Sequence, residues 1–136
     1  MRILAVDYGE RRTGLAVSDE LGITAQGLDT VTVRDEGEIL ERVAAAVAEY
    51  RAETVVVGLP LNMNGTESEK SLKVRVFADA LAQRTGAAVV FRDERMTSLQ
   101  ATRVMHETGR KTKGNKGIVD RISATILLQE HLKTLP

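Results

Sequence analysis

The sequence has no cysteine and no tryptophan, and only two prolines and four aromatic residues among its 136 positions. Without cysteine the chain forms neither disulfides nor thiolate metal sites, so we expect oxygen ligands at any metal site. Two tyrosines and two phenylalanines are too few for base stacking to make the main contribution to the free energy of nucleic-acid binding. No stretch approaches the roughly 20 apolar residues of a transmembrane helix, and no signal-peptide pattern is present, so we expect a cytoplasmic protein without a membrane partner.

The length and composition fit one compact domain spanning residues 1–136, with 43% apolar and 28% charged residues. The formal net charge is zero, but the charges are segregated along the chain. Residues 29–53 hold seven acids and three bases, whereas residues 103–121 hold six bases and two acids. The region near the C-terminus is therefore locally basic, as a nucleic-acid partner would require.

The first third of the chain predicts antiparallel strands. Apolar, β-branched runs at 2–8 and 13–19 are joined by "GERR" and predict a hairpin, and the alternation of "LDTVTV" (28–33) predicts a third strand. From Glu36 the apolar period becomes that of a helix, and "TVVVGLP" (54–60) then predicts a short buried strand.

The later elements alternate between helix and strand. A capping box of Thr66 and Glu69 opens a helix that ends at Gly86, and "AAVVF" (87–91) predicts the fifth strand. A second box, Thr97 with Gln100, opens another helix, and the last helix is expected from about Lys116 to Leu132. The order β-β-β-α-β-α-β-α-α predicts an α/β fold with a mixed five-stranded sheet covered by helices on both faces.

Three carboxylates occupy positions that are unusual for acids. Asp7 ends the apolar run "ILAV", Glu94 follows the run "VVFRD", and Asp120 lies inside the apolar stretch "GIVDRISA". Because the carboxyl ends of parallel strands meet at one edge of a sheet, Asp7 and Glu94 are expected to be neighbours. Asp120 reaches them from the last helix, where small residues such as Ser123 and Ala124 allow close packing.

A cluster of carboxylates without His or Cys suits Mg²⁺ or Mn²⁺, which also bind substrate phosphate. In a two-metal mechanism one ion lowers the pKa of an attacking water and the other stabilises the leaving oxygen, at a separation of roughly 4 Å. Asp7 would be the bridging ligand. Each acid taken alone is also consistent with an ordinary carboxylate at a strand end or on a helix surface.

Four segments resemble the YqgF family, also called RuvX: "AVDYGERRTGLAVSD" (5–19), "VVGLPLNMNGTE" (56–67), "RDERMTS" (92–98) and "VDRISATILLQ" (119–129). The resemblance covers nearly the whole chain. It implies an RNase H-like fold, with Asp7, Glu94 and Asp120 as catalytic and metal-binding acids. It also implies a nuclease acting on precursor ribosomal RNA or a resolvase of Holliday junctions.

Several basic and polar residues are candidates for binding nucleic acid. The loop "GRKTKGNKG" (109–117) places bases just before Asp120, where they could follow a phosphate backbone or simply be solvated. Asn62 could contact substrate or only form a turn, and Ser98 could bind a phosphate oxygen or only cap a helix. His106 and His131 are expected at the surface. The candidates are Arg11, Arg12, Asn62, Arg95, Ser98, Arg110, Lys111, Lys113 and Lys116.

The three acids and the basic loop favour a metal-dependent endonuclease acting on structured nucleic acid. The family resemblance implies that it processes the 5′ end of pre-16S rRNA, either free or in ribosomal precursor particles. Resolution of branched DNA and a catalytically silent RNA-binding module are the alternatives. The segment "DYGERRTGLAVSD" also resembles the first phosphate loop of actin-like ATPases, but those proteins enclose ATP between two lobes, which 136 residues do not provide. A resolvase would need a homodimer, whereas an RNA nuclease could act as a monomer.

Overall fold

The computed structural model describes residues 2–35, 37–94, 97–107 and 116–135. Within these ranges the elements are β1 (Arg2–Asp7), β2 (Arg12–Ser18), β3 (Ala25–Gly27), β4 (Val31–Thr32), α1 (Gly37–Tyr50), β5 (Ala52–Leu59), α2 (Glu69–Thr85), β6 (Ala88–Asp93), α3 (Thr97–Glu107) and α4 (Lys116–Leu132). None of the helices in these ranges is long and apolar enough to cross a membrane.

The sheet is mixed, as the sequence predicts. Its strand order is β3-β2-β1-β5-β6, and β4 pairs with β2 beside β3. The pairs β1–β2 and β2–β3 are antiparallel, whereas β5 is parallel to both β1 and β6. The carboxyl ends of β1, β5 and β6 therefore lie at the same edge of the sheet.

The predicted third strand, 28–33, is wrong in detail. The described part of the chain instead has two short strands, β3 just before this segment and β4 within it, so its sheet contains six strands rather than five. Between them the chain bonds to α4: Arg121 donates to the Leu28 carbonyl, and Thr30 Oγ1 donates to the Gly117 carbonyl. These contacts join residues about 90 positions apart, so the local alternation of residues 28–33 could not show them.

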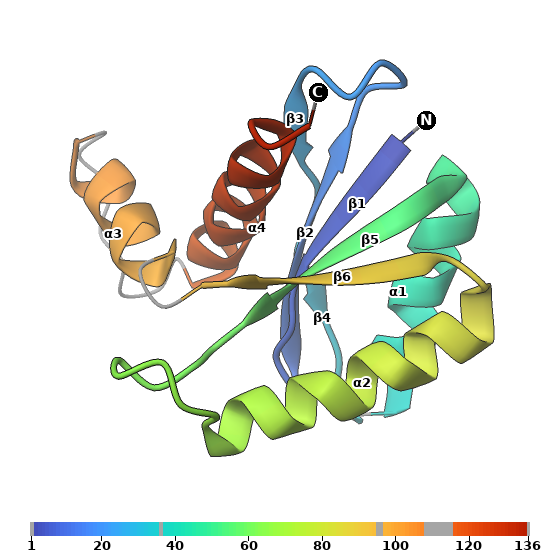
Figure 1. Ribbon diagram of the computed structural model, residues 1–136, viewed down its shortest axis with the longest axis horizontal. Coiled ribbons are helices and arrows are strands. Elements are labelled where there is room, and N and C mark those ends of the chain that lie inside the picture. The colour runs from blue at the N-terminus through green and yellow to red at the C-terminus, as the bar shows by residue number, and fades with distance from the viewer. Residues whose placement is uncertain (1, 36, 95–96, 108–115, 136) are drawn as a thin grey trace.

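Helices cover both faces of the sheet (Figure 1), with α1 and α2 on one face and α4 on the other, where α3 packs beside α4. Alternate residues of each strand point to opposite faces. In β1, Leu4 and Val6 belong to the core under α1 and α2, whereas Ile3 and Ala5 belong to the core under α4. The α4 side is built from smaller residues, which brings that helix close to the sheet.

Two helix predictions need correction. The N-cap of α2 is Ser68, which forms a capping box with Ser71, and not Thr66 with Glu69. Thr66 instead bonds within its own turn to Asn62 and Asn64. Gly86 ends α2 as predicted, at φ 75°. His131 is buried rather than at the surface, because the last turns of α4 continue to pack on the sheet, and burial lowers its pKa.

Candidate active site

The three acids singled out in the sequence line one cleft. Asp7 is the last residue of β1, Glu94 directly follows β6, and Asp120 lies near the start of α4. The parallel strands bring Asp7 and Glu94 to the same edge of the sheet, and α4 brings Asp120 to it from one face. The cleft has a volume of about 540 Å³ and is also lined by residues of α2.

Two glycines make room for these acids. Gly14 of β2 pairs with Asp7, and a Cβ atom on Gly14 would lie 2.1 Å from the Asp120 carbonyl oxygen. Gly58 of β5 lies under Glu94, since a Cβ atom there would be 2.3 Å from Glu94 Oε2. Glycine within a strand often marks a close approach of this kind. The two positions fix how near Asp120 and Glu94 come to Asp7.

The carboxyl groups of Asp7 and Glu94 share a hydrogen bond, and the pKa of each is raised. The pKa of Asp7 is raised to about 6, mainly by burial and also by the charge of Asp120, against the lowering effects of Glu94, Arg12 and Lys70. Burial and the neighbouring charge of Asp7 raise the pKa of Glu94 to about 9. Glu94 is therefore the protonated partner near neutral pH and donates to Asp7.

Asp120 is held by a cation from the hairpin. Arg12 Nε lies 2.5 Å from Asp120 Oδ2, and both side chains are partly exposed. Among the described residues, no three Asp, Glu or His side chains are grouped closely enough to share a metal ion. The donor set nevertheless suits Mg²⁺ or Mn²⁺: the oxygens are hard ligands, and a cation would offset the burial and the mutual repulsion that raise the pKa values of Asp7 and Glu94.

Helix α2 adds cations that sequence patterns did not single out. Lys70 and Lys73 both line the cleft. Lys73 Nζ lies 2.5 Å from Glu10 Oε1 in the turn of the hairpin, whereas Lys70 has no ion-pair partner among the described residues. The charge of Lys70 lowers the pKa values of both Asp7 and Glu94, so it lies close enough to act on both. Its position in the first turn of a helix that follows a strand end was the available signal.

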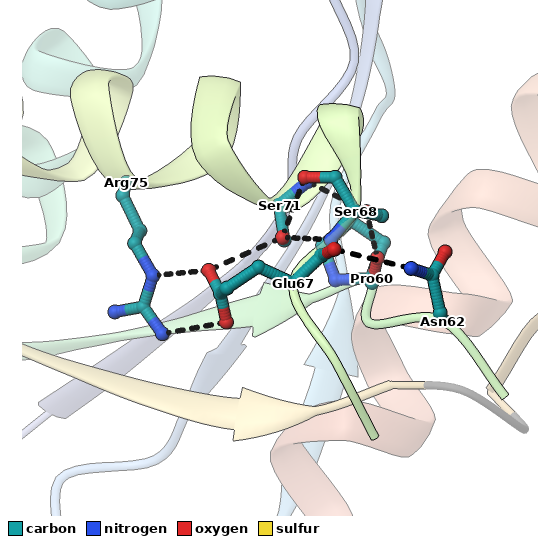
Figure 2. Close-up of polar contacts among 6 residues, drawn as sticks. All are labelled: Pro60, Asn62, Glu67, Ser68, Ser71 and Arg75. Atoms are coloured by element: carbon teal, nitrogen blue, oxygen red, sulfur yellow. Dashed lines mark hydrogen bonds and ion pairs between the residues drawn. The ribbon is translucent and has the colours of Figure 1, made fainter. Parts of the chain in front are cut away.

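The loop before α2 is fixed by a chain of polar contacts (Figure 2). Ser68 Oγ donates to the Pro60 carbonyl, Ser71 Oγ donates to Glu67, and Glu67 forms two hydrogen bonds with Arg75, at 2.7 and 3.1 Å. Pro60 itself lines the cleft. These contacts hold the cleft wall and the start of α2, and therefore Lys70, in a defined position.

The structure describes only some of the predicted nucleic-acid-binding residues. Arg12 reaches the acids, while Arg11 is exposed in the same turn. The Asn62 amide donates to Thr66 Oγ1 and to the Glu67 carbonyl, so it organises the loop. Arg95, Arg110, Lys111 and Lys113 lie outside the described residues, as do the side chains of Ser98 and Lys116.

Comparison with solved structures defines the class of fold. The fowlpox virus resolvase in complex with Holliday junction DNA superposes with a TM-score of 0.63 at 16% identity, covering 98% of both chains. Thermus thermophilus RuvC in complex with a Holliday junction substrate gives a TM-score of 0.58 at 21% identity, covering 97% of this chain and 93% of RuvC. The chain thus has the RNase H-like fold of these resolvases.

Sequence comparison identifies the family as well as the fold. The family described as "RuvX: Holliday junction resolvase" matches residues 1–134. A protein of Agathobacter rectalis named "Putative pre-16S rRNA nuclease" is 44% identical over 138 residues, covering 99% of this chain and 96% of that protein. A protein of the same name from Acetivibrio thermocellus is 45% identical over 134 residues, covering 97% and 95%. The chain belongs to the RuvX (YqgF) family.

Proposed function

We propose that this protein is a divalent-metal-dependent endonuclease that hydrolyses phosphodiester bonds in structured RNA, acting on the 5′ end of pre-16S rRNA. The observation that carries the proposal is the meeting of Asp7, Glu94 and Asp120 in one cleft with Lys70 and Lys73. Carboxylates there can hold Mg²⁺ or Mn²⁺, and lysines can contact phosphate. The names of the curated relatives favour precursor rRNA as the substrate.

Asp7 and Glu94 would hold the cation, and Asp120 would join them once Arg12 releases its carboxylate. When bound, such cations lower the pKa of a water and stabilise the leaving oxygen. Two of the chain's own groups would change when the cation binds. Glu94 gives up the proton that it donates to Asp7, and Arg12 becomes available to contact the nucleic-acid backbone.

Resolution of branched DNA is the second candidate function. It is favoured by the description of the family and by the two solved resolvases of the same fold that carry Holliday junctions. A resolvase cuts two strands symmetrically, so this function would require two copies of the chain related by a two-fold axis. A binding module without catalysis is the third candidate, although the chain keeps all three acids.

The test is cleavage of a labelled precursor of small-subunit rRNA beside a four-way DNA junction, with Mn²⁺ or with EDTA. We expect Mn²⁺-dependent cutting of the RNA that is lost in Asp7→Asn while the variant stays folded. Cutting of the junction alone would support the resolvase. Nucleic-acid binding that is indifferent to Mn²⁺, with no product from either substrate, would contradict the nuclease.

A further inference from the structure

A second groove lies next to the carboxylate cleft, between α2 and the start of α1. It has a volume of about 460 Å³ and shares Tyr8, Glu10 and Lys73 with the cleft. Its remaining wall is largely apolar and includes Leu40, Val76 and Ala80. Val76 is 72% exposed, so this wall presents apolar surface to whatever enters the groove.

The groove contains an aromatic pair next to the acids. The rings of Tyr8 and Phe77 are stacked, with centroids 4.3 Å apart and planes at 24°. These are two of only four aromatic residues in the chain. Tyr8 directly follows Asp7, so one Cα–Cα step of about 3.8 Å separates the acid from the residue that carries the ring.

The boundary between cleft and groove is polar. Lys73 Nζ and Glu10 Oε1 meet there at 2.5 Å, and both side chains are partly exposed. A lysine donates to base acceptors such as guanine O6 and N7, and a carboxylate accepts from amino groups such as cytosine N4. The groove therefore has apolar walls that can pack on a flat ring. At its edge it has a hydrogen-bond donor, Lys73, and an acceptor, Glu10.

We infer that this groove is a subsite for an unpaired base of the nucleic-acid strand whose phosphate lies in the carboxylate cleft. The inference rests on the proposed nuclease function and narrows its substrate class. The groove continues directly from the cleft, and its apolar walls and polar edge match the faces and edges of a base. A base stacked and paired in a duplex cannot enter it, so the strand is single-stranded or locally unpaired beside the cut.

The test compares two short single strands of equal length, one with all its bases and one fully abasic, so that both carry the same phosphates. Binding is measured with Ca²⁺ in place of Mn²⁺, since Ca²⁺ takes the same oxygen ligands. We expect the strand with bases to bind the wild-type protein roughly 5- to 150-fold more tightly, the usual range for one stacked base. Pairing the bases in a full duplex should remove this gain in affinity.

Ala80→Trp fills the groove from α2, and Ala48→Trp places the same side chain on the exposed surface of α1 as a control. We expect Ala80→Trp to bind both strands equally, near the affinity of the wild type for the abasic strand. Ala48→Trp should keep the wild-type preference. Equal binding of the two strands by the wild type, no binding of either strand, or an unchanged preference in Ala80→Trp would overturn the subsite.

Cleavage of the strand with bases, measured with Mn²⁺, separates this inference from the proposed function. Preference for bases without cleavage would keep the subsite and contradict the nuclease. Cleavage without preference would keep the nuclease and contradict the subsite.

Discussion

The carboxylate of Glu94 lies directly over Gly58, at a place where a Cβ atom would be 2.3 Å from Oε2. Gly58 follows Val57 in β5, and Val57 pairs with Val6, the residue before Asp7. The missing side chain of Gly58 therefore opens the space through which Glu94 reaches Asp7. The position of the Glu94 carboxylate therefore depends on a glycine of a neighbouring strand.

Gly58→Ala should reduce cleavage by about 100-fold or more, because the new Cβ must displace the Glu94 carboxylate and a shift of about 1 Å has that cost. Gly117→Ala is the matched control, since among the described residues a Cβ atom there meets only Thr30, at 3.8 Å. Single-turnover cleavage rates measure the effect. A Gly58→Ala variant as active as Gly117→Ala would contradict the dependence of cleavage on this position of the Glu94 carboxylate.

Glu94→Gln should raise the melting temperature of the metal-free protein at alkaline pH. The pKa of Glu94 is raised from 4.5 to about 9, so the folded state keeps a proton that the unfolded chain loses above pH 4.5. This group contributes stability that is fully present below pH 4.5 and is lost as pH rises through about 9. Gln cannot ionise and avoids that loss.

The measurement for Glu94→Gln is thermal unfolding in EDTA from pH 5 to pH 9. The gain in melting temperature should grow with pH, by about 3–5 °C for each kcal/mol in a domain of this size. Glu53→Gln, at an exposed position of β5, is the control and should follow the wild type. Parallel curves for the wild type and Glu94→Gln would refute the buried pairing with Asp7.

Lys70→Met should lower kcat/KM roughly tenfold, which corresponds to one charged hydrogen bond to phosphate. The slope of log affinity against log salt should fall by about one, because one phosphate contact is removed. Lys70→Arg should restore most of the activity. Lys133→Met, just beyond the end of α4 that is far from Asp120, is the control. Equal salt slopes for the wild type and Lys70→Met would exclude contact between Lys70 and the nucleic-acid backbone.

The three candidate acids could be singled out in the sequence because each of them ends or interrupts an apolar pattern. Asp7 ends a strand, Glu94 directly follows one, and Asp120 interrupts the apolar face of a helix, so these positions could be recognised locally. The lysines of α2 gave no such signal, since a lysine on a helix surface is ordinary. Lys70 becomes a candidate only when the fold places the start of α2 beside the ends of β1 and β6.

Where prediction failed, distant contacts outweighed local pattern. The alternation of residues 28–33 fits one strand, but Arg121 and Gly117 of α4 bond to the segment between β3 and β4. The capping signal at Thr66 was outweighed by Ser68, whose hydroxyl also reaches the Pro60 carbonyl. His131 was assigned to the surface because no local pattern shows that α4 packs on the sheet to its last turn.

The most direct test of the carboxylate site is calorimetric titration of Mn²⁺ at pH 7 into the wild type, Asp7→Asn and the control Asp19→Asn, whose carboxylate caps an exposed loop. We expect Mn²⁺ binding with proton release in the wild type and in Asp19→Asn, because Glu94 holds a proton at this pH. Affinity in Asp7→Asn should fall at least about tenfold. Equal Mn²⁺ affinity in the wild type and Asp7→Asn would contradict a metal site built on Asp7.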